Sequence, residues 1–184
     1  MNPGPTSEPG DVAVRVLLGS FDPDADPPDP VHLLVRRFRA GERVATRAVV
    51  GVATALPDLM DDLGSGRAVP IAVPGHDGTI SVGMRALMTA LGAAAGRPAA
   101  GHPVLARHVA IPEVKVHGAR DPSAELASLR WLSGGGMRGI DRVVLLDDVL
   151  VSGGTLRACV AAMRRDGWRG EVTALVLARA IPTH

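Results

Sequence analysis

The chain has 184 residues, of which 46% are hydrophobic and 21% are charged, so one domain with a buried core is expected. The formal net charge of +1 and the scarcity of aromatic side chains (two Phe, two Trp and no Tyr) argue against a nucleic-acid partner. A single cysteine excludes an internal disulfide, and no apolar run is long enough to span a membrane. Without the pattern of a secretory signal at the start, we expect a cytoplasmic protein.

The beginning of the chain predicts a tail, a strand and a loop. Met1–Gly10 is rich in Pro, Gly and Ser and is expected to be disordered, which leaves residues 11–184 for a single domain. Asp11–Leu18 contains alternating β-branched residues and predicts a strand. Asp22–Pro30 contains four Asp and four Pro. Because the prolines exclude regular structure and leave no regular metal-ligand spacing, we interpret it as a solvated loop.

Two helical stretches follow, Val31–Arg39 and Val44–Leu63, with a break or kink expected at Pro57. Three arginines lie within Arg36–Arg39, at the end of the first stretch. A basic run of this kind on a helix is typical of a solvated face, and we interpret it in that way.

The next segment predicts a buried strand, a tight loop and a helix. Ala68–Val73 is a short apolar run of the kind found in parallel sheets. Pro74–Gly78 combines proline, glycine and polar residues and predicts a tight turn. Either Thr79 or Ser81 can cap the helix that follows, which we expect to extend to about Ala95.

The C-terminal half continues the alternation of strands and helices. A short strand is expected at Val104–Ala106, and the polar, Gly-rich segment Ala110–Gly139 is expected to form a mobile excursion. Asp141–Val149 is the clearest strand, Gly153–Asp166 predicts a helix, and Glu171–Ala178 predicts a last buried strand. The alternation predicts an α/β fold with a mostly parallel sheet.

The strongest chemical signal lies in Val143–Thr155, where a buried strand delivers two adjacent carboxylates, Asp147 and Asp148, to its C-terminal edge. The turn after them contains glycines that let backbone N–H groups approach a phosphate, and Ser152 and Thr155 add hydroxyl donors. Carboxylates beside a polyanion are explained if they bind sugar hydroxyls while a divalent cation neutralises the charge. A ribose 5-phosphate that carries a pyrophosphate satisfies both halves; a capped turn with two incidental acids is the alternative.

Leu145–Thr155 resembles the motif that binds 5-phosphoribosyl-1-pyrophosphate (PRPP) in type I phosphoribosyltransferases, with a permitted residue type at every position. It is neither a Walker A loop nor a dinucleotide fingerprint. The resemblance implies a three-layer, Rossmann-like phosphoribosyltransferase fold with a core at residues 68–179 and lead-in or hood elements at residues 11–67. It also implies Mg²⁺ carried with PRPP, no metal bound directly by the protein, and a possible homodimer. Asp147 and Asp148 would hold the ribose as catalytic carboxylates, and the 5′-phosphate would be held by Val151, Ser152, Gly153, Gly154 and Thr155.

A wider resemblance, over about residues 31–179, is to the ComF-like branch of that superfamily. The shared order comprises a lead-in at Val31–Gly41, a strand entering a loop at Ile71–Pro74, a helix containing Arg85, the Leu105–Arg107 segment and Arg120. The resemblance implies a transferase that moves ribose 5-phosphate to an unknown nitrogen nucleophile and releases pyrophosphate. The branch equally admits a non-catalytic PRPP-binding sensor or an accessory protein for DNA uptake.

The chain departs from the family in three ways. It lacks the cysteines of the zinc module common in the ComF-like branch. Val151 stands where purine transferases of the hypoxanthine–guanine kind have an acid, which disfavours that substrate group. The pyrophosphate loop, formed by Pro74, Gly75, His76 and Asp77, contains an acid where the family has Lys or Arg, and this weakens pyrophosphate binding unless charge comes from elsewhere.

The missing positive charge has candidates in the excursion, where the family has a flexible loop that closes over PRPP. Lys115 and Arg120 are the flexible-loop candidates, and they lie close in sequence to Arg107, His108 and His117. An ordinary solvated loop remains an equal interpretation. His76 can likewise bind phosphate or only fill a turn.

The acceptor would be bound by the hood, with few aromatic side chains available to stack on it. The possible stacking partners are Phe21, Phe38, Trp131 and Trp168. Cys159 lies on the helix after the motif with no base suggested nearby, so we interpret it as a core residue.

Overall fold

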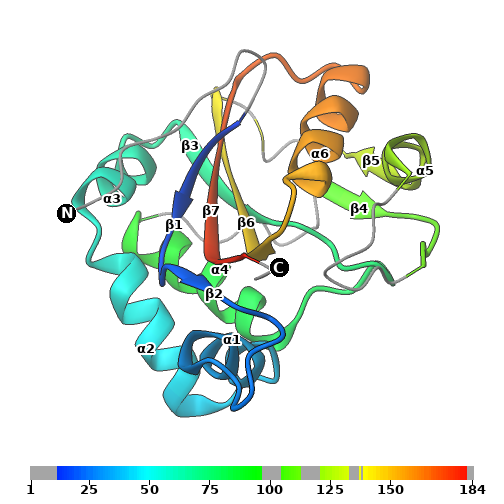
Figure 1. Ribbon diagram of the computed structural model, residues 1–184. Coiled ribbons are helices and arrows are strands. Elements are labelled where there is room, and N and C mark those ends of the chain that lie inside the picture. The colour runs from blue at the N-terminus through cyan, green and yellow to red at the C-terminus, as the bar shows by residue number, and fades with distance from the viewer. Residues whose placement is uncertain (1–11, 97–104, 113–120, 133–136, 138, 182–184) are drawn as a thin grey trace.

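The computed structural model describes residues 12–96, 105–112, 121–132, 137 and 139–181 (Figure 1). The N-terminal tail that the composition predicts to be disordered lies outside this part of the chain. None of the helices in the described ranges is long and apolar enough to pass through a lipid bilayer.

A parallel sheet forms the centre of the molecule. Among the described residues it has five strands: β1 (Ala13–Val16), β2 (Ser20–Phe21), β3 (Ala68–Ala72), β6 (Arg142–Leu150) and β7 (Glu171–Ala180). The order is β1-β7-β6-β3, and β2 pairs with β7 beyond the end of β1. In the register, Leu145 of β6 lies between Ile71 and Ala174. Pro70 is tolerated because β3 is at the end of this order, where one side needs no backbone donor.

Alternate side chains of β6 enter two separate cores, which is why the strand is continuously apolar. Val144 and Leu146 face four helices: α1 (Pro30–Arg39), α2 (Arg43–Thr54), α3 (Pro57–Gly64) and α4 (Val82–Ala94). Val143 and Leu145 face α6 (Gly154–Arg165) and, next to it, β4 (Leu105–Arg107), α5 (Pro122–Ser128) and β5 (Leu129–Trp131). Figure 1 shows α5 and α6 on one side of the strands and α2 and α3 on the other. The expected α/β fold with a mostly parallel sheet is confirmed.

Most of the predicted elements form at the predicted places. The helical stretch after residue 43 is divided at Pro57 into α2 and α3, and Ser81, not Thr79, caps α4 by accepting a hydrogen bond from the Met84 amide. Gly153 precedes α6 with a left-handed φ of 73°, as expected for a glycine in that turn.

The segment Ala110–Gly139, predicted to hold a mobile excursion, contains regular structure in its described central part. Residues 122–131 form α5 and β5, and β5 pairs antiparallel with β4. Glu125 and Ser128 are buried in this unit. Polar side chains therefore build a packed element here, and hydrophobic periodicity does not reveal such elements.

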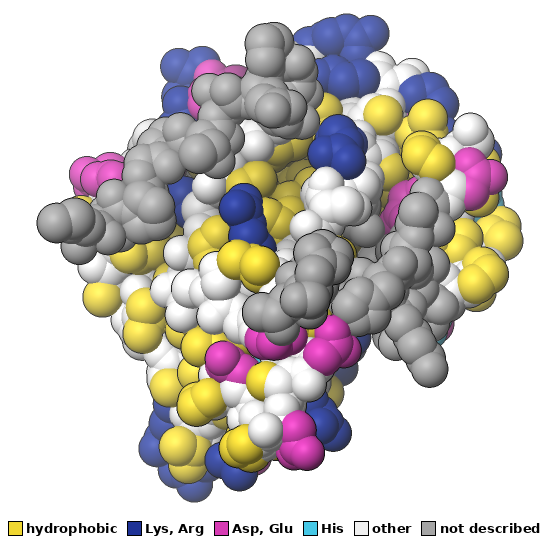
Figure 2. All heavy atoms as spheres, viewed as in Figure 1, with side chains coloured by type: hydrophobic (Ala, Val, Ile, Leu, Met, Phe, Trp, Pro, Cys, Tyr) yellow, Lys and Arg dark blue, Asp and Glu magenta, His cyan; other side chains and the backbone are white. Residues whose placement is uncertain are grey.

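Charges of both signs are scattered over the molecule. On the face drawn in Figure 2, Lys and Arg side chains gather near the end of α6 and again over α1 and α2, with acidic side chains between the two areas. No single sign covers that face, which agrees with the net charge of +1.

Candidate functional site

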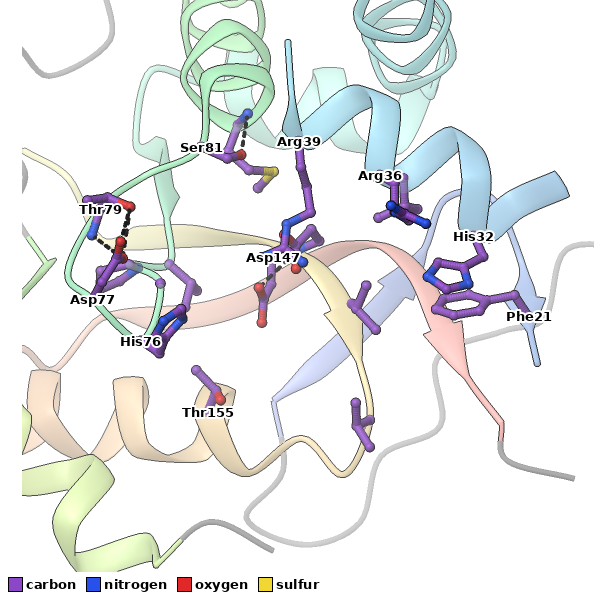
Figure 3. A pocket seen from close by; sticks show the side chains of 18 residues that line it. Phe21, His32, Arg36, Arg39, His76, Asp77, Thr79, Ser81, Asp147 and Thr155 are labelled. Atoms are coloured by element: carbon purple, nitrogen blue, oxygen red, sulfur yellow. Dashed lines mark hydrogen bonds and ion pairs between the residues drawn. The ribbon is translucent and has the colours of Figure 1, made fainter. Parts of the chain in front are cut away.

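A cavity of about 390 Å³ opens at the carboxyl ends of β3 and β6 (Figure 3). Its walls are the loop after β3, the end of β6 with the start of α6, and one face of α1. Ligands of open parallel sheets bind at this edge, because loops from neighbouring strands converge there and helix N-termini point towards it.

The turn from β6 to α6 supplies one wall of the cavity. Asp147 and Asp148 both line it, and Asp147 Oδ1 accepts a hydrogen bond from the Asp148 amide at 2.9 Å. Gly153, the residue before α6, has no side chain with which to cap the helix. Thr155, in the first turn of α6, points into the cavity. Backbone donors, a helix N-terminus and a hydroxyl thus meet two carboxylates.

The loop after β3 is held in shape by its own hydrogen bonds. The Gly75 amide donates to the Thr79 carbonyl at 2.8 Å, and the Gly78 amide donates to the Gly75 carbonyl at 3.0 Å. Asp77 Oδ1 accepts from the Thr79 amide at 2.9 Å and from Thr79 Oγ1 at 2.8 Å. These two bonds hold the pKa of the Asp77 carboxyl below its ordinary value. Asp77 therefore stabilises the loop through its bonds to Thr79.

Arg107 fixes this loop from the neighbouring small sheet. Its side chain is fully buried, and its Nε donates to the Gly75 carbonyl at 2.8 Å. The same guanidinium pairs with Glu125 at 2.9 Å and donates to Ser128 Oγ. Arg107 is thus a structural cation inside the protein, and its guanidinium is committed to these partners.

Arginines of α1 form the third wall, which the sequence analysis missed. His32, Arg36 and Arg39 line the cavity, and Arg39 Nε lies 2.9 Å from Asp148 Oδ2. Arg37 faces elsewhere and pairs with Glu42 at 3.7 Å. Arg36 and Arg39 are exposed, as expected for a solvated face, but they also line the cavity; their i+4 and i+7 spacing from His32 places the three side chains on one side of the helix.

Of the four aromatic side chains proposed as stacking partners, Phe21 alone lines the cavity. Its ring stacks on His32, with centroids 4.8 Å apart and 22° between the planes. Phe38, on the inner side of α1, is fully buried. Trp131 packs against Trp168 in the core on the other face of the sheet. These three side chains are therefore not available to a ligand in this cavity.

The remaining predicted site residues divide into three groups. The cavity lining includes Pro74, Gly75, His76, Asp77, Asp147, Asp148, Val151 and Thr155. The turn between the last two is formed by Ser152, Gly153 and Gly154, with the Gly154 amide 3.4 Å from Ser152 Oγ. The flexible-loop candidates, Lys115 and Arg120, lie outside the described residues.

Two further observations concern metal ligands and the single cysteine. Across the described ranges, no three His, Cys, Asp or Glu side chains are grouped so that they could hold a metal ion. Cys159 is buried, which confirms its interpretation as a core residue, and burial raises the pKa of its thiol far above the ordinary value.

Compared with known proteins, the chain matches no family model and no curated sequence. The geometry of the cavity and the motif at its edge therefore carry the functional argument.

Proposed function

We propose that the cavity binds PRPP and that the chain transfers its ribose 5-phosphate unit to a nitrogen nucleophile. The observation that carries this proposal is the convergence of two loops on one cavity. The loop at residues 74–77 and the segment at residues 147–155 follow neighbouring parallel strands, and both line the same space. A ligand in which a sugar joins a phosphate to a pyrophosphate matches that arrangement.

The ribose and its phosphate suit the β6–α6 side of the cavity. Asp147 and Asp148 offer carboxylate oxygens that accept hydrogen bonds from the ribose hydroxyls. The 5′-phosphate suits the turn at residues 152–155, where backbone amides, the Thr155 hydroxyl and the positive end of α6 are available.

The pyrophosphate group suits the loop at residues 74–77, provided that its charge is neutralised. Arg39 lines this cavity and carries a positive charge, which in the structure is paired with Asp148. Carboxylate oxygens are donors that Mg²⁺ prefers, and Asp147 and Asp148 fit an ion that arrives with PRPP and is held through water. When bound, the ion would neutralise negative charge on the leaving pyrophosphate.

The proposed reaction is a displacement at C1 of the ribose. A nitrogen lone pair forms the new bond to C1, and the bond from C1 to the pyrophosphate oxygen breaks, with its electron pair leaving on pyrophosphate. If that nitrogen carries a proton, the proton passes to solvent; a ring nitrogen without one keeps the positive charge. The residues of the site accelerate the step by holding the ribose in place and by stabilising the positive charge that develops on it.

The test is titration calorimetry with PRPP and Mg²⁺. We expect the intact protein to bind, and we expect the combined changes Asp147→Asn, Asp148→Asn and Thr155→Ala to abolish binding, because they remove the hydroxyl acceptors and a phosphate donor. Asp61→Asn is the matched control, since Asp61 is exposed on α3 and does not line the cavity. Absence of binding by the intact protein contradicts the proposal.

A second candidate is a PRPP-binding protein without transferase activity. It is favoured by the Arg39–Asp148 ion pair, which engages a carboxylate proposed for the ribose, and by the commitment of Asp77 to Thr79. Release of pyrophosphate from PRPP, measured against a panel of nitrogen nucleophiles, separates the two candidates. Binding without release for every nucleophile selects the non-catalytic one.

A further inference from the structure

One face of α1 presents a row of cationic and aromatic side chains to the cavity. His32, Arg36 and Arg39 are spaced by four and three residues, so they follow one another along the same side of the helix. Val35, which is buried, lies between them and seats the helix on the core. The row forms part of the cavity wall, and its position is fixed because α1 packs against α4 and the sheet.

Arg36 has no assigned role in the proposed PRPP site. Arg39 pairs with Asp148, and Arg37 pairs with Glu42 on another side of the helix. Arg36 forms no ion pair with any side chain that the structure describes, although its guanidinium lines the cavity. Arg36 is exposed at the cavity wall, where its guanidinium can pair with an anionic group of a ligand.

The Phe21–His32 pair provides a flat surface beside this cation. The rings stack at 4.8 Å, and both residues line the cavity. In Figure 3 the pair and Arg36 lie on one side of Asp147, whereas His76 and Asp77 lie on the opposite side. A planar ligand that contacts His32 therefore has Arg36 one helical turn away.

The position of these residues agrees with the direction of the proposed displacement. If pyrophosphate leaves on the side of the loop at residues 74–77, the nucleophile approaches C1 from the opposite side of the ribose. Phe21, His32 and Arg36 are on that side of the two carboxylates. They form what we name the hood subsite.

We propose that the hood subsite binds a planar nitrogen nucleophile that carries a carboxylate, with Arg36 pairing with the carboxylate and the Phe21–His32 stack supporting the ring. The proposal deepens the proposed function and rests on it, because the ligand is an acceptor only if the protein is a transferase. A guanidinium recognises a carboxylate through two parallel hydrogen bonds, which an uncharged amide cannot reproduce. The subsite therefore discriminates by charge between acceptors of the same shape.

The test compares an acid with its amide. Pyridine-3-carboxylate and pyridine-3-carboxamide are titrated into the protein and followed by NMR, with and without PRPP and Mg²⁺. We expect the carboxylate to bind at least about ten-fold more tightly than the amide, and Arg36→Gln to weaken the carboxylate by about ten-fold to a hundred-fold, the range for a lost charged hydrogen bond. Arg36→Lys should recover part of the loss.

Arg37→Gln is the matched control, because it removes the same charge from the same helix outside the cavity, and it should leave carboxylate binding unchanged. Equal binding of acid and amide, no binding of either, or an effect of Arg36→Gln on PRPP equal to its effect on the carboxylate overturns the hood subsite. If PRPP fails to bind but the carboxylate binds through Arg36, the subsite stands and the transferase proposal fails. If PRPP binds and the carboxylate does not, the proposed PRPP site stands and the hood subsite fails.

Discussion

Arg107 shows how one buried side chain connects the core to the site. Its guanidinium donates to the carbonyl of Gly75 in the cavity loop and pairs with Glu125, whose side chain is 2% exposed. A charge in this position is costly to bury unless it is paired and hydrogen-bonded. Each nitrogen of the Arg107 guanidinium has one of the three partners, and these bonds at the same time fix the loop.

Arg107→Met is expected to lower the free energy of unfolding by about 3 to 5 kcal/mol, because it leaves the Glu125 carboxylate buried without its cation. The double change Arg107→Met with Glu125→Met removes both charges and should recover most of that stability. Urea denaturation of the three proteins measures the difference.

The double variant also separates stability from loop position. The Gly75 carbonyl still lacks its donor in that variant. We therefore expect PRPP affinity to stay reduced by about ten-fold, as for one lost hydrogen bond to a charged group. Recovery of both stability and PRPP affinity in the double variant would show that Arg107 acts through stability alone.

At the residue scale, the sequence identifies the carboxylates and the phosphate turn but not the arginine wall. Asp147 to Thr155 are adjacent in sequence, so their chemistry is visible as one motif. Arg36 and Arg39 belong to a run that also contains Arg37, and their spacing from His32 does not show whether their side of the helix or that of Arg37 lines a cavity. Only the packing of α1 over the sheet edge decides this.

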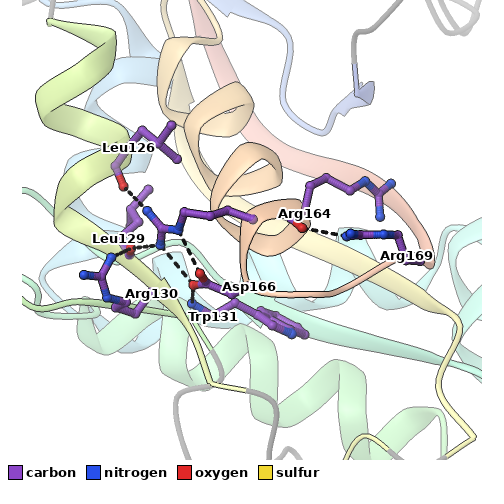
Figure 4. A network of polar contacts seen from close by, with 8 residues as sticks. Leu126, Leu129, Arg130, Trp131, Arg164, Asp166 and Arg169 are labelled. Atoms are coloured by element: carbon purple, nitrogen blue, oxygen red, sulfur yellow. Dashed lines mark hydrogen bonds and ion pairs between the residues drawn. The ribbon is translucent and has the colours of Figure 1, made fainter.

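At the element scale, the end of α6 holds the small sheet in place. Arg165 donates to the Leu129 carbonyl at 2.6 Å, and Asp166 accepts from the Trp131 amide at 2.8 Å (Figure 4). Arg165 and Asp166 also bond to each other at 2.7 Å. Backbone groups of β5 are thus satisfied by side chains about 35 residues later, a dependence that no local pattern in residues 110–139 could indicate.

This connection predicts a specific response to acid. Hydrogen bonds from the Arg165 side chain and the Trp131 amide hold the pKa of Asp166 well below its ordinary value of 3.8. A carboxyl group whose pKa is lower in the folded state stabilises the fold above its unfolded pKa, and that stabilisation is lost as the pH falls towards the folded pKa. The loss from Asp166 therefore begins below about pH 5 and grows as the pH decreases.

Asp166→Asn is expected to cost about 1 kcal/mol of unfolding free energy at neutral pH, since the ion pair is partly exposed to solvent. Because the amide does not titrate, the variant should lose less stability than the unaltered protein between about pH 5 and pH 3. Denaturation measured across that interval gives both quantities. Parallel acid profiles for the two proteins would mean that Asp166 does not contribute to the acid sensitivity.

At the scale of the whole molecule, the cavity depends on how closely α1 approaches α4. Gly83, in the first turn of α4, is the contact point: a Cβ added there would lie 2.8 Å from the Phe38 carbonyl carbon and 2.9 Å from its ring. The alternation of strands and helices predicts the α/β layers, but it does not predict this approach. It depends on a glycine whose function appears only when two helices distant in sequence meet.

Gly83→Ala should therefore act on both stability and binding. We expect the free energy of unfolding to fall by about 2 kcal/mol, because the new methyl group meets backbone atoms that cannot rotate away. If the protein relieves the overlap by moving α1 outward, Arg36 and Arg39 move with it, and PRPP and carboxylate affinities fall together.

Gly51→Ala is the matched control, since Gly51 is on α2 with open space around it and the change should stabilise the helix by about 0.5 to 1 kcal/mol. Denaturation and calorimetry of the two variants decide the matter: a Gly83→Ala protein as stable as the Gly51→Ala protein would show that α1 is not seated through this glycine.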